Sequence, residues 1–508
     1  MKCIFSKLLF SIQHKRKVVI ALVSFLTCFG SFANNIAISN LSLTGKNTTD
    51  HYTLVQFDIS WDNSFRISSE SANWDAAWIF VKYRYAGGVW QHAFLNNAGH
   101  LAPLGSTIYP GIFNPSATFN PTTNPGLGAF IYRDSDGTGT FSKTGVQLRW
   151  NYGVNGVGDN DEVEIQVFAI EMVYVPQGAF TIGSGGSEAA AFYKYPSSTT
   201  PYIINSEAAI PVGAAQDYLY YEHTTYSSDQ LGPIPALYPK GYNAFYCMKY
   251  EISQQGYVDF LNNITTTQAT NRFSVQSSYR NGINVSGNVY YTTYPYVACN
   301  FLGWPDITAY YDWSGLRPMT ELEFEKACRG PISPVANEYV WGTTGIASNP
   351  YTLNNIGSSS EVIGSNYNVS TSIGNAAHSL STPRNGAING PVRVGIFAGT
   401  AGNNSRITAG ATYYGIMEMG GNLWERPVSL GNPTGRAFDG THGDGSLNST
   451  GFSNVSTWPG SDAVGSGFRG GHWGDYAVFL RTSDRNYAAY VEPGRFFYVG
   501  GRGVRIAP

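Results

Sequence analysis

Cysteine and histidine are the residues of this chain whose side chains could bind a metal or act as nucleophiles, and both are few. Of five cysteines, Cys3 and Cys28 lie in the first 33 residues, which leaves Cys247, Cys299 and Cys328. Three thiols form at most one internal disulfide, and whether Cys247 pairs with Cys299 stays open. No cysteine follows Cys328. Chemistry that needs a pair of thiols in the C-terminal third of the chain is therefore excluded.

The histidines offer no metal-ligand spacing. They are scattered along the chain and include no close pair at helical spacing. Ligation by neutral imidazoles requires several rings to converge on one ion, so the pattern favours isolated surface or core histidines. They are His14, His51, His92, His100, His223, His378, His442 and His472.

The tail from Arg469 to Gly501 is rich in aromatic residues. Eight of its 33 residues are Trp, Tyr or Phe, against 15% in the whole chain, and they alternate with Gly, Ala, Asp, Asn and Val. Rigid amphipathic rings beside small adaptable residues are the composition of binding surfaces, although an aromatic core explains part of the pattern. We predict a ligand-binding surface made of His472, Trp473, Asp475, Tyr476, Phe479, Tyr487, Tyr490, Phe496, Phe497 and Tyr498.

Composition limits the class of protein that must position these residues. A chain of 508 residues can form two or three domains. Only 13% of its residues are charged, against roughly 25% in an average soluble protein. The formal net charge is −3 and the region after residue 33 has no block of Lys and Arg, so nothing indicates a nucleic-acid partner.

The N-terminus has the pattern of a signal peptide. Lys15-Arg16-Lys17 precedes an apolar run over residues 18–29, and Ser31-Phe32-Ala33 supplies small residues for cleavage after Ala33. The run is shorter than the ~20 residues of a membrane-spanning helix, and no small residue stands just ahead of Cys28 as lipidation would require. We predict residues 1–33 as a signal peptide, a secreted or cell-surface (periplasmic or extracellular) protein, and no transmembrane segment after cleavage.

Residues 34–170 alternate in the manner of β-strands, and residues 171–508 mix short strands, helices and long loops. Val55-x-Phe57-x-Ile59-x-Trp61 is one of several alternating runs, and these predict an immunoglobulin-like β-sandwich over residues 34–170. In the second region, Ser253 is placed to cap a helix over residues 254–262. Thr320 and Glu323 form a capping box before another helix, which Gly330 ends.

Several segments of the second region resemble one known family. They are Met172-Val173-Tyr174-Val175-Pro176, Leu316-Arg317-Pro318-Met319-Thr320-Glu321-Leu322-Glu323-Phe324-Glu325, Gly420-Gly421-Asn422-Leu423-Trp424-Glu425, Arg469-Gly470-Gly471-His472-Trp473 and Gly501-Arg502-Gly503-Val504-Arg505. Their order is similar to that of sulfatase-modifying-factor domains, also called formylglycine-generating-enzyme-like domains, over about residues 171–505. The resemblance implies a variant C-type-lectin fold. We therefore expect an α+β, loop-rich chain with an N-terminal β-sandwich and such a domain over residues 171–508.

The resemblance also implies an activity that this chain lacks the residues for. The enzymes of the family oxidise a sulfatase cysteine to formylglycine and use two of their own cysteines to bind copper(I), which prefers soft thiolates. The matching window, residues 473–480, contains no thiol. The related iron sulfoxide synthases use three histidines, for which no converging set is visible here. We expect no copper and no formylglycine-generating activity.

The same resemblance implies that the domain binds structural calcium. Family domains hold structural calcium near Gly-Asn-x-Trp-Glu, which here implies Glu425 with the carbonyls of Gly421 and Leu423. A second site would use Asn355 and the carbonyl of Ile356. Hard cations do take carboxylate and carbonyl oxygens. The alternative is that Glu425 pairs with an arginine.

Two functional hypotheses follow. The first is a secreted, non-catalytic protein that binds an unknown protein or glycan through its aromatic tail. The tail also loosely resembles the variable tails of diversity-generating-retroelement proteins, which implies that it differs between copies. The alternative is a sulfatase-modifying-factor-type oxidoreductase with an unrecognised metal centre.

Overall fold

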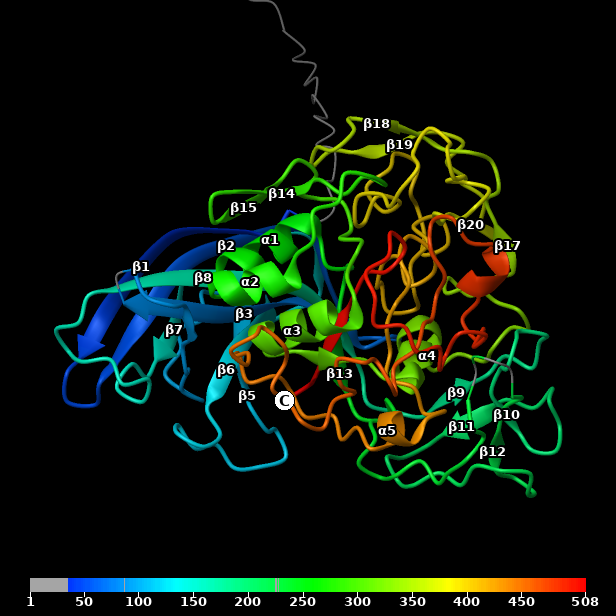
Figure 1. The fold of residues 1–508 in the computed structure, drawn as a ribbon, viewed down its shortest axis with the longest axis horizontal. Helices are drawn as coiled ribbons and strands as arrows, with labels where there is room; N and C mark the ends of the chain where they lie inside the picture. Colours follow the sequence, from blue (N-terminus) through cyan, green and yellow to red (C-terminus); the bar gives the residue numbers. More distant parts are fainter. Residues whose placement is uncertain (1–34, 86, 224–225, 227) are drawn as a thin grey trace, which may run out of the picture. The chain divides into compact units, whose positions relative to one another are not determined.

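The computed structural model describes residues 35–85, 87–223, 226 and 228–508. From residue 35 onward they belong to one compact unit (Figure 1). The predicted signal peptide, residues 1–33, lies outside the described residues. Within the described part of the chain, no helix has the length and apolar character needed to cross a membrane.

The first part of the chain folds into two layers of antiparallel strands. β2 and β3 pair only where they join, at Arg66↔Trp74 and Ile67↔Asn73, so each can contribute to a different layer. One layer contains β1 (Ala37–Asn47), β2 (Tyr52–Ile67) and β7 (Gly137–Trp150). The other contains β5 (Ser106–Ile112), β6 (Gly126–Arg133), β3 (Asn73–Tyr85) with the short β4 (Gln91–His92), and β8 (Val163–Val175).

The core between these layers confirms the alternation in the sequence. Val55, Phe57, Ile59 and Trp61 of β2 are all at most 2% exposed, and they pack against Ala77, Ile79, Val81 and Tyr83 of β3. The other face of β3 is buried too, because Trp78 and Phe80 pack into a second core with the helices of the later region. A strand buried on both faces ties the two regions together.

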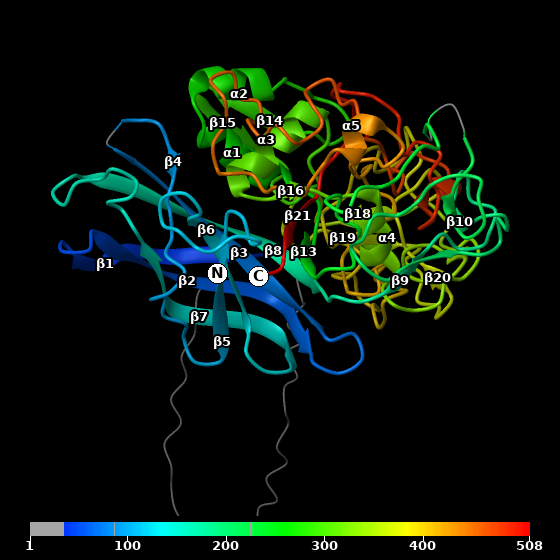
Figure 2. The same cartoon turned by 90° about the horizontal axis from the view of Figure 1, so that it is seen from below.

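The sheet continues from the first region into the second. β8 pairs with β3 along residues 163–173 and with β13 (Phe245–Met248) at its end. β13 in turn pairs with β21 (Gly503–Ile506), and β21 with β16 (Arg317–Pro318). The strand order is therefore β3-β8-β13-β21-β16, which Figure 2 shows from below. The predicted boundary between residues 170 and 171 falls inside β8.

Two helices begin at the capping residues that the sequence indicated, Ser253 and Thr320. The Ser253 side chain accepts a hydrogen bond from the Gly256 N–H at the start of the first helix, and Thr320 and Glu323 bond each other's backbone N–H groups. All nine residues of the fourth helix are buried. The helices are α1 (Gln254–Asn262), α2 (Thr266–Arg272), α3 (Trp304–Ser314), α4 (Glu321–Arg329) and the one-turn α5 (Pro433–Arg436).

Most of the second region is loop, held by two-stranded ribbons. These are β9 (Phe180–Ile182) with β11 (Tyr202–Ile204), β10 (Tyr193–Lys194) with β12 (Leu219–Tyr220), β14 (Ile283–Ser286) with β15 (Val289–Thr292), β17 (Gly345–Ile346) with β20 (Ile373–Gly374), and β18 (Thr352–Asn354) with β19 (Val362–Ser365). Between β20 and β21 regular structure is limited to α5 and a short 3₁₀ helix, Ala477–Leu480. The tail must therefore be positioned by side chains.

Candidate functional site

Buried ion pairs on α4 hold the tail in place. Arg469 Nη2 lies 2.9 Å from Glu325 Oε1, and Arg485 Nε lies 2.7 Å from Glu321 Oε2. All four side chains are fully buried. Burial alone would raise the pKa of Glu325, but Arg469 and Arg329 hold it below its usual value. Two arginines of the tail are thus fixed to two successive turns of one helix.

A second set of contacts brings the Gly415–Arg426 segment beside the tail. The Trp424 N–H donates to the Tyr498 carbonyl at 3.0 Å, and the Glu425 N–H donates to the Arg469 carbonyl at 3.0 Å. Glu425 Oε1 itself lies 2.6 Å from Arg502 Nε. The two segments that stand about fifty residues apart in the sequence therefore lie side by side.

The glycine pair that opens the tail is required by this packing. Gly470 has φ +88°, and a Cβ there would lie 2.5 Å from the Met419 carbonyl oxygen. Gly471 has φ +71°, and its Cβ would lie 2.6 Å from Leu480 Cδ1. Both positions favour glycine because of backbone conformation and space.

Two of the residues predicted to contact a ligand are core residues. Trp473 is 0% exposed and packs with Leu423 and other apolar residues, and His472 is 2% exposed. The His472 ring stacks on Tyr498 at 5.2 Å between centroids. Burial, together with nearby Arg384, lowers the pKa of His472 to about 3, so this imidazole is neutral at physiological pH. Their contribution is to support the surface, because neither is exposed to a ligand.

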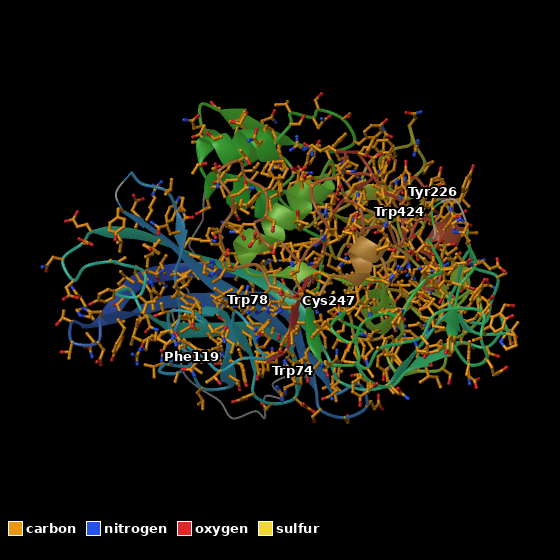
Figure 3. The ribbon with its side chains drawn as sticks, turned by 60° about the horizontal axis from the view of Figure 1, so that its bottom comes forward. Trp74, Trp78, Phe119, Tyr226, Cys247 and Trp424 are labelled. Atoms are coloured by element: carbon orange, nitrogen blue, oxygen red, sulfur yellow. The ribbon has the colours of Figure 1, made fainter. Side chains whose placement is uncertain are left out.

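The other predicted residues form two groups of rings that reach the surface. In the first, Trp424 contacts Phe479 at 6.1 Å and Tyr487 at 5.7 Å between ring centroids, and Tyr226 stacks on Tyr487 at 5.3 Å. Figure 3 labels Trp424 and Tyr226. Tyr490 contacts Tyr487 at 5.9 Å. Tyr226 belongs to a loop far from the tail in sequence, and no pattern in the sequence indicated it.

The second group is centred on Tyr498. Its ring stacks on Phe496 at 5.2 Å and meets the edge of Phe497 at 5.0 Å. All three side chains are half-buried. Tyr476 is 73% exposed. We call the half-buried residues Asp475, Phe479, Tyr487, Tyr490 and Tyr498, with exposed Tyr476, the tyrosine face.

Asp475 lies between the two groups of rings. Its carboxylate is 3.4 Å from His472 Nε2 and accepts a hydrogen bond from Trp424. Its charge raises the pKa of both Tyr487 and Tyr498, after the larger effect of their burial. Burial in turn raises the pKa of Asp475 to about 7. A raised pKa means that the hydrogen bonds and cations around the Asp475 carboxylate do not offset the cost of burying its charge.

The comparisons with known proteins assign the scaffold. A family model described as the sulfatase-modifying factor enzyme 1-like domain matches residues 160–505. The chain belongs to this family. No curated protein matches it. The match begins just before β8 and ends in β21, so the sulfatase-modifying factor-like domain shares its central sheet with the N-terminal strands.

The sulfatase-modifying factor-like domain of this chain has an arginine at the first predicted calcium site. Arg502 occupies Oε1 of Glu425, as the alternative interpretation of the sequence proposed, while Oε2 has no hydrogen-bond donor. At the second predicted site, Ile356 is 63% exposed and the Asn355 carbonyl accepts two hydrogen bonds from Ser358. Among the described residues, no three His, Cys, Asp or Glu side chains gather as a metal group.

The three thiols of the domain lie outside the tail in sequence, in apolar clusters that also include tail residues such as Leu480 and Val499. Cys247, Cys299 and Cys328 are buried and free, so Cys247 does not pair with Cys299. Cys247 and Cys328 pack in one apolar cluster and Cys299 in another. Burial raises the pKa of Cys247 to about 12 and raises those of the other two thiols. All three are neutral thiols and poor ligands for copper(I).

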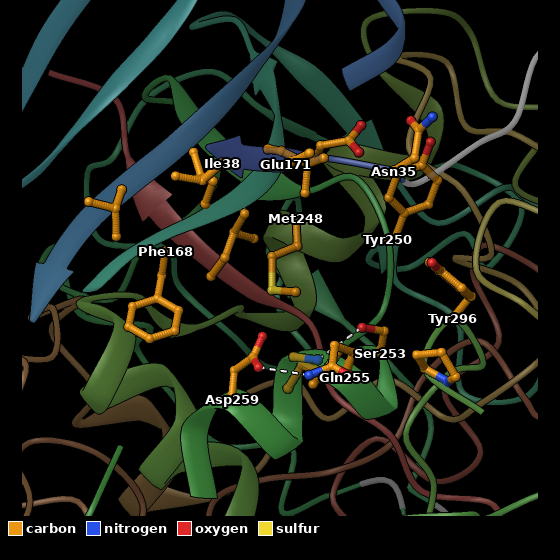
Figure 4. A pocket seen from close by; sticks show the side chains of 18 of the residues that line it. Asn35, Ile38, Phe168, Glu171, Met248, Tyr250, Ser253, Gln255, Asp259 and Tyr296 are labelled. Carbon is orange, nitrogen blue, oxygen red and sulfur yellow. Dashed lines mark hydrogen bonds between the residues drawn. The ribbon is translucent and has the colours of Figure 1, made fainter. Parts of the chain in front are cut away.

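A cavity of about 710 Å³ is a feature that the sequence did not indicate. It lies between β1, β8 and α1, and none of the predicted ligand-binding residues lines it. Figure 4 shows Asp259 among its lining residues, hydrogen-bonded to Gln255 at 2.8 Å, with Phe168 and Met248 also on the walls. Burial raises the pKa of Asp259. Asp259 stands four positions after Gln255, on the helix face opposite Tyr257 and Leu261, so no pattern in the sequence indicated a cavity.

Proposed function

We propose that this chain is a secreted, non-catalytic ligand-binding protein, built on a sulfatase-modifying factor-like domain of C-type-lectin type, and that the tyrosine face binds a protein or glycan. The observation that carries the proposal is the state of three phenols. The hydroxyls of Tyr487, Tyr490 and Tyr498 make no hydrogen bond to any described residue and are open to solvent, although their rings are half-buried. Neighbouring rings hold these three rings, and no residue in the described part of the chain bonds their hydroxyls.

Fixed rings with free polar ends suit binding for an energetic reason. Binding immobilises flexible side chains at a cost of about 0.5–1.5 kcal/mol each. The rings of Tyr487 and Tyr490 are already restrained by each other and by Tyr226. Such rings lose little further freedom when a ligand covers them, and they supply both apolar area and hydrogen-bonding hydroxyls.

The non-catalytic part of the proposal rests on the thiols. Copper(I) chemistry needs two converging thiolates at the tail, and the tail has none. The three thiols elsewhere are buried and protonated. Stoichiometric copper or iron in the purified protein, measured by atomic emission, would overturn this part and favour an oxidoreductase.

The test compares the tyrosine face with tyrosines elsewhere. Purified full-length protein is screened against a glycan array and a phage library of random dodecapeptides. A variant with Tyr476, Tyr487 and Tyr498 changed to Ala is expected to lose the binders. The control variant has Tyr109 and Tyr291 changed to Ala. These tyrosines lie on β5 and β15 and are 46% and 48% exposed. The control variant should still bind the recovered ligands. Ligands that bind the triple-alanine variant as well as they bind the wild-type protein would contradict the proposal.

Two further parts of the proposal have their own tests. If the tail is diversified, sequences of near-identical copies of the chain should differ at Tyr476 and Tyr487 while Trp473 and Arg485 stay fixed. Invariance at the first pair with differences elsewhere would contradict diversification. Structural calcium is tested by titrating the chelated protein with calcium in a calorimeter, and absence of heat would end that idea.

A further inference from the structure

We infer that the ligand of the tyrosine face is a protein segment with a basic side chain, Lys or Arg, which docks against Asp475 between the two groups of rings. This inference rests on the proposed function and specifies its ligand. It follows from the charges at the face, from the geometry of the rings and from the polar atoms that the face leaves unpaired.

Two carboxylates and two arginines lie near the centre of the face: Glu492 and Asp475, with Arg426 and Arg384. The Tyr498 phenol is close enough to Glu492 and Asp475 for both carboxylates to raise its pKa, after burial. Arg426 is the nearby cation that lowers the pKa of this phenol, but its own side chain is 2% exposed. Arg426 donates to the Glu492 carbonyl and Ser466 Oγ, and its guanidinium stacks 3.9 Å from the Phe468 ring. It therefore cannot move to neutralise Asp475 without leaving these partners.

Asp475 itself has no cationic partner in the described part of the chain. No Lys or Arg nitrogen lies within 4.0 Å of its carboxylate, and Oδ2 is buried without a hydrogen bond. The neighbouring His472 has its pKa lowered to about 3 and supplies no charge. Arg384 is close enough to lower the pKa of Asp475, but its guanidinium lies 4.9 Å from the Phe497 ring. After burial, the charge of Asp484 also raises the pKa of Asp475.

The rings around Asp475 favour the same kind of ligand. Trp424 donates to the carboxylate, and after burial the charge of Asp475 raises the pKa of both Tyr487 and Tyr498. A cation that approaches a carboxylate between aromatic rings gains from the ring quadrupoles as well as from the ion pair. A sugar hydroxyl can donate a hydrogen bond to the carboxylate, but unlike a cation it supplies no opposite charge. The geometry therefore favours a basic protein segment over a glycan.

Binding is then expected to depend on pH in one direction. A cationic group binds the ionised form of Asp475, whose pKa burial has raised to about 7. Protonation below that pH competes with the ligand, so affinity should rise from pH 5.5 to pH 8 and then level off. The imidazole of His472 stays neutral across this range because its pKa is about 3.

The experiment uses full-length protein and dodecapeptides recovered from the phage library, synthesised with a fluorophore and titrated by anisotropy. Peptides that lose binding to Tyr487→Ala should contain Lys or Arg. Asp475→Asn, which keeps the size and one hydrogen-bonding oxygen, should weaken them about tenfold or more and remove their pH dependence. The matched control is Asp217→Asn, an exposed aspartate paired with Lys194 on another loop, and it should change nothing.

The peptide side of the contact gives an independent measurement. Replacing the basic residue of the peptide by Gln should weaken binding to wild-type protein as much as Asp475→Asn does. The two changes together should weaken it little further. Peptides or glycans that lose binding to Tyr487→Ala but bind Asp475→Asn as tightly as wild type would overturn the inference and leave the proposed function standing. Binders indifferent to Tyr487→Ala would overturn both.

Discussion

Changing Arg485 to Met tests whether the buried ion pairs on α4 hold the tail. Arg485 donates to both oxygens of Glu321, at 2.7 and 3.1 Å, and to the Ala190 carbonyl at 3.0 Å. Its guanidinium also lies 3.9 Å from the Phe192 ring. Met fills most of the volume of the arginine stem but supplies none of these interactions.

The magnitude follows from what Glu321 retains. Arg469 Nη1 is 3.4 Å away, the Leu430 N–H donates at 2.8 Å and Ser429 Oγ donates at 3.4 Å, so the carboxylate keeps a distant cation and two hydrogen bonds. Removing one partner of a buried pair costs about 3–5 kcal/mol in general. The remaining partners favour the lower half of that range, and loss of the contact with Phe192 adds about 1 kcal/mol. We expect Arg485→Met to lower the free energy of unfolding by about 4 kcal/mol.

Urea unfolding followed by tryptophan fluorescence measures this difference. The matched control is Arg84→Met, which removes an exposed pair with Glu164 at 2.8 Å and should cost less than about 1 kcal/mol. Adding Glu321→Gln to Arg485→Met should recover part of the loss, because a neutral amide is less costly to bury than an unpaired carboxylate. Equal midpoints for Arg485→Met and Arg84→Met, or strictly additive effects of the two α4 changes, would refute the reasoning.

Four further substitutions test other parts of the structure. Burial raises the pKa of Glu171 from 4.5 to about 7, so its native state binds more protons than the unfolded chain and its contribution to stability is lost as pH rises through 7. The free energy of unfolding of Glu171→Gln, measured with urea, should therefore rise relative to that of wild type as pH increases from 5 to 8. A difference that does not change with pH would contradict this. Trp473→Ala should cost about 3–5 kcal/mol and Tyr476→Ala less than about 0.5 kcal/mol in the same assay; similar losses would contradict their placement in the core and on the surface. Gly470→Ala should be destabilising by circular-dichroism melting, because its Cβ would meet the Met419 carbonyl at 2.5 Å, and a wild-type melting curve would show that the backbone adapts.

The sequence by itself determined the local elements and the family. Alternation places Val55, Phe57, Ile59 and Trp61 on one face of a strand because side chains alternate with period two, whatever the strand packs against. Caps such as Thr320 with Glu323 act within one turn, so residue types and spacing are sufficient to locate the helix start. The motif over residues 316–330 was recognisable because its residue types and spacing stand in one continuous segment, which includes α4.

Only the tertiary structure decided which tail residues face a ligand and which partners the acids take. His472, Trp473 and Tyr476 stand within five positions and are 2%, 0% and 73% exposed, a difference that no regular period can express in a loop. Glu425 takes Arg502 as its partner from 77 residues away, and Tyr226 reaches the tail from a separate loop. Spacing along a chain without helix or strand carries no directional information. The burial of each tail side chain was therefore fixed by the distant segments that pack around it.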